Sequence, residues 1–318
     1  MAVLVTGAGL IGAGFAREAI ARGEEVIFLD PEPRADYLRF KLGDSGWKLL
    51  WGDVRDLPML TAVMTEHKVS AVVHTAGLIG GKVQKSLFHA FDINLGGTRN
   101  VAEAVRLTGV KRLVHMSTMG VYDTRRASNT NVPEDFWRGA GRGYGNYKAA
   151  KELILETYAN EYKFELLMIR PANVYGFGHF FAGSSGGMKM QALLEAGMNG
   201  GIAKIPSSET MANEYIYWKD IGRAVDIAVR SPMPKDRIFN TGNGYVTPFE
   251  DVVGAVRKLC PQVSFEIEKG EPPKSKAQAM DIARAKAQLG WEPQYSIDAG
   301  FADYLEEMER ARSFFGKA

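Results

Sequence analysis

Two overlapping tyrosine–lysine pairs have types and spacing that can do chemistry. They are Tyr144 with Lys148 and Tyr147 with Lys151. Residues four positions apart lie on one face of a helix, so in each pair the ammonium can sit beside the phenol. A neighbouring positive charge lowers the pKa of a phenol, which makes tyrosinate an accessible base for removing a hydroxyl proton. The spacing alone leaves both pairs open.

A hydroxyl group upstream of these pairs can bind a substrate oxygen. Ser117 and Thr118 stand where an apolar run that begins at Arg112 ends. Either side chain can donate a hydrogen bond to the oxygen whose proton the tyrosine removes. Two such features in one chain, together with the glycine turn described next, are poorly explained by chance.

The chain opens with a pattern typical of dinucleotide binding. After the apolar run 3–6 come Gly7, Gly9 and Gly12, spaced as Gly-x-Gly-x-x-Gly, and then a helical pattern. The first glycine permits a tight turn, the second lets the backbone approach a diphosphate, and the third lets the helix pack close to the strand. The diphosphate then lies at a helix N-terminus, where free N–H groups favour negative charge.

Two acids follow the next predicted strands. Asp30 ends the apolar run 25–30, where its carboxylate can accept hydrogen bonds from the adenosine ribose. A carboxylate there would repel a 2′-phosphate, so NAD is favoured over NADP, and Arg34 is interpreted as a solvated loop charge. Asp53 can reach the adenine, or it can instead cap the helix predicted over 57–66.

The elements that must position these residues alternate along the chain. Short apolar runs predict strands, and segments of helical period predict helices between them, which indicates an α/β fold with a doubly wound parallel sheet of the Rossmann type. The predicted strands are 3–6, 25–30, 48–51, 71–75, 112–117 and 166–170, and the predicted helices are 11–22, 57–66, 87–108 and 144–162.

Beyond about Pro171 the pattern changes to glycine-rich and proline-punctuated segments. We therefore expect an NAD-binding domain over residues 1–175, to which a segment at about 212–245 returns. Residues 176–318 are expected to form mainly a smaller C-terminal substrate lobe. Trp218 and Trp291 are expected to anchor the core, and His74 and His115 to pack at strand ends.

Taken together, these features resemble the extended short-chain dehydrogenases/reductases of the NAD-dependent epimerase/dehydratase family. The family pattern places a glycine after the catalytic tyrosine and an acid four residues after the lysine, as Gly145 and Glu152 stand here. The resemblance therefore selects Tyr144 and Lys148. It extends through the segments 72–78, 83–85, 94–98, 117–122, 170–176, 215–220, 240–242 and 289–293.

The resemblance also implies a set of site residues. Thr118, Tyr144 and Lys148 would be catalytic, with Thr118 holding the substrate oxygen. The residues lining NAD would be Gly7, Gly9, Leu10, Ile11, Gly12, Asp30, Asp53, Val54, Thr75, Ala76, Gly77, Asn94, Met116, Ser117, Tyr144, Lys148 and Pro171. Those facing the substrate would be Leu78, Thr118, Tyr144, Asn173, Asn213 and Tyr215. The predicted helices 87–108 and 144–162 would pair with their copies in a homodimer.

Three positions depart from the family pattern, and two of them bear on the substrate. The first two glycines of the turn are one residue closer than usual, which concerns the cofactor diphosphate. Asn213 stands where sugar-nucleotide enzymes of the family carry an arginine for the substrate diphosphate. A second family arginine, expected before the Asp281 region, is also absent, and Lys269 is a loose substitute. Loss of a bidentate guanidinium is not conservative. The pattern therefore favours a substrate without a nucleotide.

The leading hypothesis is an NAD-dependent dehydrogenase that acts on a hydroxyl or keto group of a small polar substrate such as a sugar or sugar acid. The alternative is a sugar-nucleotide 4-epimerase or dehydratase in which NAD stays bound. A third hypothesis is a catalytically silent NAD-binding protein. The intact set of Thr118, Tyr144 and Lys148 argues against the third.

Composition narrows the remaining classes. The 318 residues carry a net charge of +2, which predicts no nucleic-acid partner. Cys260 is the single cysteine, so no intrachain disulfide can form and a reducing, cytoplasmic location is expected. No apolar run is long enough to span a membrane, and the five histidines show no metal-ligand spacing. We therefore predict no membrane partner and no metal.

Overall fold

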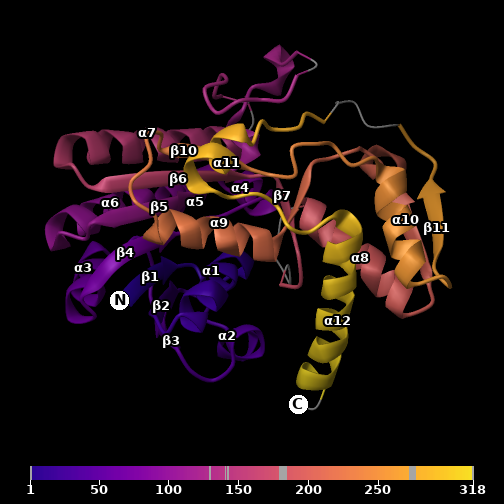
Figure 1. The fold of residues 1–318 in the computed structure, drawn as a ribbon, viewed down its shortest axis with the longest axis horizontal. Helices are drawn as coiled ribbons and strands as arrows, with labels where there is room; N and C mark the ends of the chain where they lie inside the picture. Colours follow the sequence, from indigo (N-terminus) through magenta and orange to yellow (C-terminus); the bar gives the residue numbers. More distant parts are fainter. Residues whose placement is uncertain are drawn as a thin grey trace.

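A seven-stranded parallel sheet forms the centre of the computed structural model, which describes residues 2–128, 130–139, 141, 143–178, 185–271 and 277–316 (Figure 1). The strand order is β10-β6-β5-β4-β1-β2-β3. The strands from β6 to β3 follow the order of dinucleotide-binding sheets, with β10 added at one edge. The predicted doubly wound sheet is thus confirmed. Its strands are β1 (Ala2–Thr6), β2 (Glu25–Asp30), β3 (Trp47–Trp51), β4 (Val69–His74), β5 (Arg112–Met116), β6 (Glu165–Pro171) and β10 (Ile238–Thr241).

Helices cover both faces of this sheet, because its strands are apolar on both sides. In β1, Val3 and Val5 pack with α1 (Leu10–Ala21) and α9 (Trp218–Arg230). Leu4, between them, points to the opposite face, where it joins the cluster of α3 (Leu57–Glu66), α6 (Gly97–Thr108) and α7 (Gly143–Tyr162). Near-continuous apolar strands of this kind are typical of parallel sheets buried on both sides.

The helix expected over 87–108 is interrupted. It consists of α5 (Leu87–Phe91), a π-helical turn (Asp92–Gly96) and α6, in one continuous path. Wider turns of this type often occur at functional sites, and this one carries Asn94. Two short helices, α2 (Ala35–Leu42) and α4 (Gly81–Lys85), were not expected, because segments of five to eight residues give little helical periodicity.

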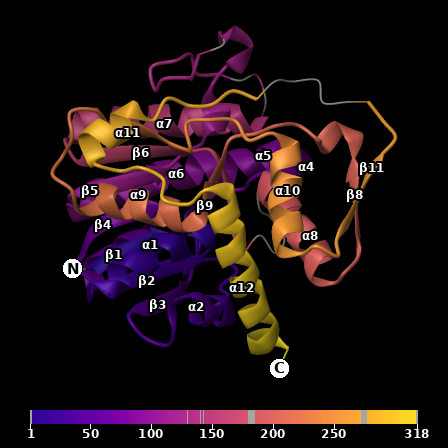
Figure 2. The same ribbon diagram turned by 45° about the vertical axis from the view of Figure 1, so that its right-hand side comes forward.

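The second half of the chain adds a smaller lobe beside the sheet (Figures 1 and 2). Two small parallel pairs lie here, β8 with β11 and β7 with β9. Trp218 and Trp291 are fully buried, as expected. The elements are β7 (Asn173–Tyr175), α8 (Ser185–Met198), β8 (Ile202–Pro206), β9 (Tyr215–Tyr217), α10 (Phe249–Leu259), β11 (Ser264–Glu268) and α12 (Ile297–Phe315). Helix α11 (Ala283–Leu289) lies instead beside β10 of the main sheet (Figure 1).

Two further features of the fold are the apolar character of its helices and the position of its cysteine. Within the residues that the structure describes, no helix combines the length and apolar character needed to cross a membrane. Cys260 is a buried free thiol at the end of α10, against Gly197.

Candidate active site

The glycine turn after β1 forms a cradle that side chains would fill. Gly7 has a φ of +99°, and a Cβ added to it would lie 2.6 Å from Thr75 Oγ1. A Cβ on Gly12 would lie 2.6 Å from the Gly7 carbonyl oxygen, so the start of α1 packs tightly under the turn. A Cβ on Gly9 would meet nothing within 4 Å. The turn is therefore tightly packed at Gly7 and Gly12 and has free space at Gly9.

The N-terminus of α1 supplies unpaired donors to that open space. Gly9 is its N-cap and provides no side-chain hydrogen bond, while Leu10 and Ile11 are the first helical residues. The first N–H groups of a helix have no partner within it, and they attract phosphate oxygens. This turn fits the diphosphate of a dinucleotide, despite the closer spacing of its first two glycines.

The two acids expected on the adenosine side follow neighbouring strands: Asp30 is the last residue of β2, and Asp53 lies two residues beyond β3. Asp30 accepts hydrogen bonds from the backbone N–H groups of Ala8 and Glu32, each at 2.8 Å, which ties it to the glycine turn. Asp53 is held by the Arg55 guanidinium, which lowers the pKa of that carboxyl. It does not cap α3, since Asp56 takes that position. Val54 follows Asp53 and is buried.

The segment after β4 lies next to the glycine turn. The Thr75 hydroxyl donates to the Thr6 carbonyl oxygen at 2.6 Å, so the segment is fixed to the end of β1. Asn94 braces it from the π-helical turn. Its Oδ1 accepts from Leu78 N at 2.7 Å, and its Nδ2 donates to the Leu78 carbonyl at 3.2 Å.

Thr118, Tyr144 and Lys148 meet at the carboxyl end of β5. Burial raises the pKa of Tyr144 to about 12, and a side-chain hydrogen bond with Thr118 acts in the opposite direction. Burial lowers the pKa of Lys148 to about 8, and its amine donates to the Met116 carbonyl at 2.6 Å. The expected lowering of the phenol pKa by this lysine is therefore wrong for the structure as it stands.

The second tyrosine–lysine pair is arranged differently. The Tyr147 hydroxyl donates to the Leu87 carbonyl at 3.0 Å, and its ring packs edge-on against Phe91. Lys151 donates to the Ala76 carbonyl at 2.9 Å. Because the Tyr147 hydroxyl is engaged on the α5 side, the geometry favours Tyr144 as the reacting phenol.

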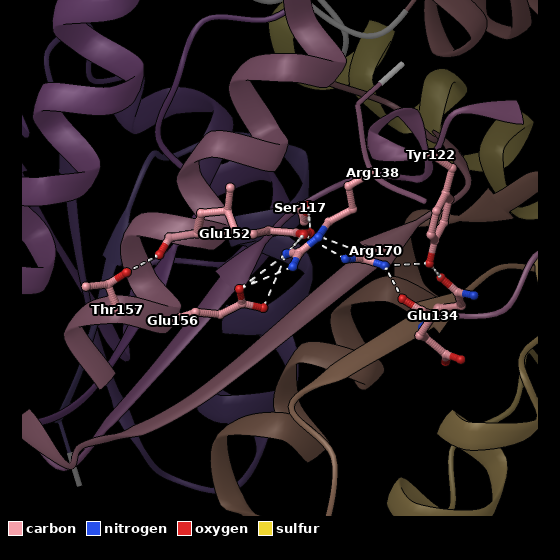
Figure 3. Close-up of polar contacts among 10 residues, drawn as sticks. Ser117, Tyr122, Glu134, Arg138, Glu152, Glu156, Thr157 and Arg170 are labelled. Atoms are coloured by element: carbon pink, nitrogen blue, oxygen red, sulfur yellow. Dashed lines mark hydrogen bonds and ion pairs between the residues drawn. The ribbon is translucent and has the colours of Figure 1, made fainter. Parts of the chain in front are cut away.

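A buried polar network lies behind β5 and α7 (Figure 3). The Glu152 carboxylate accepts from Ser117 Oγ at 2.5 Å and from Arg170 Nε and Nη2 at 2.9 and 2.7 Å. Arg170 also donates to the Tyr122 hydroxyl, and Arg138 reaches Glu152 at 3.0 Å. Ser117 thus points into this network, which leaves Thr118 as the hydroxyl available to a substrate.

Sequence reasoning missed the partners that complete this network. Arg138 bridges Glu152 and Glu156, and the Glu134 carbonyl accepts from Arg170 at 2.8 Å. Arg138 and Glu134 lie in the irregular segment between β5 and α7, where the sequence shows no periodicity. The one signal of this network in the sequence was Arg170, at the end of a predicted buried strand, because a buried charge requires a partner.

Three of the residues expected at the substrate, Asn173, Asn213 and Tyr215, lie close together in the second half of the chain. Asn173 Nδ2 donates to the Glu214 carbonyl at 3.0 Å, one residue after Asn213. Asn213 pairs with Thr247 in an isolated antiparallel bridge. Tyr215 is 1% exposed, and its hydroxyl accepts a hydrogen bond from Asn213 Nδ2 at 3.4 Å.

Pro171 and Leu78 are the last two of the expected site residues. Pro171 ends β6, beside Thr241 of β10. Leu78 packs with Tyr144 against the small cluster of Val83, Ala90 and Tyr147. His74 and His115 are fully buried at the ends of β4 and β5, as expected, and burial holds the pKa of both rings well below the usual value.

Comparison with known proteins gives these features a family. The model of the NAD dependent epimerase/dehydratase family matches residues 3–242. This chain belongs to that family. A UDP-glucose 4-epimerase of Mycolicibacterium smegmatis is 32% identical, over 96% of this chain and 98% of its own length. A dTDP-glucose 4,6-dehydratase of Xanthomonas campestris is 26% identical over 95% of this chain and 92% of its own.

Solved structures of the epimerase/dehydratase family superpose along the whole chain. The UDP-glucose 4-epimerase of Thermus thermophilus, in complex with NAD, has a TM-score of 0.80 at 26% identity, covering 98% of this chain and 100% of that one. The enzyme from Thermotoga maritima, with UDP-glucose, has a TM-score of 0.84 at 23% identity, covering 98% and 99%. The protein is an enzyme of the family, and its cofactor is NAD.

Proposed function

We propose that this enzyme is an NAD-dependent sugar-nucleotide 4-epimerase that keeps its cofactor bound through the reaction. The observation that carries the proposal is the placement of three side chains at the carboxyl end of β5. Thr118 and Tyr144 both lie within 4 Å of a Cβ built on Gly120, and the buried Lys148 donates to the Met116 carbonyl. The relatives named above support this reading over the dehydrogenase favoured by the sequence, because UDP-glucose 4-epimerases match nearly the full chain.

The order of strands supports the direction in which NAD would lie. Asp30 ends β2, Asp53 follows β3, the glycine turn follows β1, and Thr118 follows β5. The adenosine would therefore lie over β2 and β3, the diphosphate over Gly7–Gly12, and the nicotinamide over β4 and β5. The other proposed cofactor contacts divide in the same way, with Val54 on the adenosine side and Thr75, Ala76, Gly77, Asn94, Met116, Ser117 and Pro171 on the nicotinamide side.

Each catalytic residue would have one task. Without cofactor Tyr144 is protonated at neutral pH, since its pKa is about 12. When bound, NAD would supply the hydride acceptor, together with a positive charge that favours the tyrosinate, so the phenol proton would pass to solvent before the sugar reacts. The tyrosinate, beside Thr118, would then take the C4 hydroxyl proton and later return it. Lys148, whose amine donates to the Met116 carbonyl, would hold the nicotinamide ribose.

Epimerisation is better supported than dehydration. Loss of water needs an additional acid and base for the leaving hydroxyl and for a carbon-bound proton. Met119 and Gly120 follow Thr118, and neither side chain can transfer a proton. The buried carboxylates Glu152 and Glu214 are engaged, by Arg170 and by backbone N–H groups of Gly244 and Met280 respectively.

Asn213 favours a second candidate, an NAD-dependent dehydrogenase of a small polar substrate such as a sugar acid. An amide cannot make the bidentate, charge-assisted contact that a guanidinium makes with phosphate. In the described residues, Asn213 Nδ2 donates to the Met211 carbonyl at 3.2 Å. On this candidate the same Thr118, Tyr144 and Lys148 would act, and NADH would leave the enzyme.

We also propose a homodimer. Leu87, Phe88 and Phe91 of α5 and Leu153 of α7 are exposed apolar side chains, and Phe88 is 88% exposed. Contiguous exposed apolar residues mark interaction surfaces, and these two helices are the ones that the family resemblance pairs across a dimer.

The test is a substrate panel. Purified enzyme is incubated with UDP-glucose, UDP-galactose, free hexoses and sugar acids, with the Tyr144→Phe variant as control. Formation of a 4-epimer without net NADH supports the epimerase, and stoichiometric NADH from a free sugar or sugar acid supports the dehydrogenase. No turnover of any sugar nucleotide, with turnover of an unactivated substrate, would refute the epimerase.

A further inference from the structure

Lys151 is a buried lysine that the proposed reaction does not use. It lies one helical turn after Lys148 on α7 and is 1% exposed. Its amine donates to the Ala76 carbonyl oxygen at 2.9 Å. Among the residues that the structure describes, no carboxylate lies within ion-pair distance of this amine. Burying an amine without an acid is costly, and the bond to Ala76 is its compensation.

The titratable groups that act on this amine are all basic. Lys148 faces it from the same helix, His74 from β4 and His115 from β5. Burial lowers the pKa of Lys151 well below its usual value, and the charge of Lys148 acts in the same direction. Within the described residues, the amine acts as a hydrogen-bond donor to a backbone carbonyl rather than as a member of an ion pair.

The bond made by Lys151 fixes a short stretch of backbone. Gly77 has a φ of +151°, and a Cβ on it would lie 2.7 Å from Asn94 Oδ1 and 3.2 Å from Lys151 Nζ. The segment 75–78 is thus clamped from two sides, by Asn94 of the π-helical turn and by Lys151 of α7. Thr75 joins it to the end of β1 on the third side.

The position of this segment gives the clamp a function. In the sheet order, β4 lies between β1, which carries the glycine turn, and β5, which carries Thr118. The segment 75–78, which follows β4, therefore lies between the diphosphate turn and the site of Thr118 and Tyr144. Asp30 and Asp53 are on the other side of β1, at the end of β2 and just after β3.

We propose that Lys151 is a positioning residue for the nicotinamide half of NAD, which it serves by holding the Ala76 carbonyl and the segment 75–78 in place. The inference rests on the cofactor placement of the proposed function. It predicts an effect on one half of the dinucleotide only. The adenosine half is bound across β1, β2 and β3, which Lys151 does not contact.

The experiment compares the binding of NAD and of ADP by calorimetry, after release of any co-purified nucleotide. In the variant Lys151→Met a thioether of similar length replaces the amine and leaves the Ala76 carbonyl without its donor. We expect NAD to bind roughly tenfold more weakly and ADP to change by less than about twofold. The melting temperature should not fall, because a costly buried amine is removed. Lys151→Gln, which keeps a donor, should recover part of the NAD affinity.

Lys111→Met is the matched control, because Lys111 is an exposed lysine outside the cleft, and its affinities should equal those of the parent. Unchanged NAD affinity in Lys151→Met, or equal weakening of NAD and ADP, would overturn the inference. If Lys151→Met does not fold, the ratio of NAD to ADP affinity in Lys151→Gln decides in the same way. A parent enzyme that binds no NAD would instead refute the proposed function.

Discussion

Replacement of Glu152 by glutamine tests how far the reaction depends on the network behind the site. Glutamine keeps the shape of the side chain but removes its charge. Arg170, whose side chain is fully buried like that of Glu152, then loses the carboxylate that holds its Nε and Nη2. Arg138 keeps a partner in Glu156, so the uncompensated charge is that of Arg170.

The magnitude follows from that uncompensated charge. Breaking a buried ion pair by removing one partner costs about 3–5 kcal/mol. For a chain of this size each kcal/mol lowers the melting temperature by about 2 °C, so Glu152→Gln should melt roughly 6–10 °C lower. The catalytic rate should also fall, because Ser117 loses its charged acceptor next to Thr118.

The pH dependence gives a second measurement. Burial alone would raise the pKa of Glu152, but hydrogen bonds from Arg170, Ser117 and Arg138 outweigh it and hold the pKa below 4.5. A carboxyl whose folded pKa is depressed stabilises the fold above its unfolded pKa, and that contribution disappears as the pH falls through the folded value. The difference between parent and variant should therefore be largest near neutral pH and shrink below about pH 4.5.

Melting curves by circular dichroism across this pH range would measure both effects. The control is Glu156→Gln, since Glu156 is partly exposed and contacts only Arg138 within this network. A drop of less than about 2 °C at neutral pH in Glu152→Gln, or one that does not shrink in acid, would refute the reasoning. Removing both charges in Glu152→Gln/Arg170→Met should cost less than the sum of the single changes.

Four further predictions concern the site and the assembly. Tyr144→Phe should lower turnover by about 10²–10⁴-fold with NAD affinity unchanged, and comparable loss of binding would contradict its role as base. Asp30→Ala should weaken the binding of NAD roughly tenfold and reduce the preference for NAD over NADP, both measured by calorimetry. An unchanged ratio of the NAD and NADP affinities would contradict this prediction. Phe88→Glu should convert a dimer to a monomer in light scattering, and a parent that is already monomeric would contradict the dimer. Asn213→Arg should lower the KM for a sugar nucleotide roughly tenfold, and no change would indicate that no diphosphate lies there.

The sequence predicted the sheet and the cofactor turn because both depend on local patterns. A strand, a glycine turn and a helix are consecutive, so Gly7, Gly9 and Gly12 are placed by their neighbours alone. The carboxyl ends of parallel strands share one edge, which brings Asp30 and Thr118 to the same cleft without knowledge of any contact. The segment 87–108 was harder, because a π-helical turn inside a helix leaves the apolar periodicity almost unchanged.

Side-chain directions on α7 lay beyond the reach of spacing. Both tyrosine–lysine pairs satisfy the same i and i+4 rule, and what separates them is the Leu87 carbonyl, which takes the hydroxyl of Tyr147. The pKa of Tyr144 was misjudged for a related reason. Burial dominates that phenol, while Lys148 donates its hydrogen bond to a backbone carbonyl. Both outcomes depend on residues distant in sequence, which no local pattern records.

In the proposed function, the chemistry and the choice of substrate depend on different parts of the chain. Thr118, Tyr144 and Lys148 lie at the end of β5 and on α7, beside the dinucleotide-binding sheet. Asn213 and Asn173 belong to β7, β9 and the segments that join them to the smaller lobe. A substitution in the lobe, such as asparagine at position 213, can change what is bound without disturbing hydride transfer. For that reason the relatives support the type of reaction more strongly than they support the nucleotide on the substrate, and Asn213→Arg separates the two.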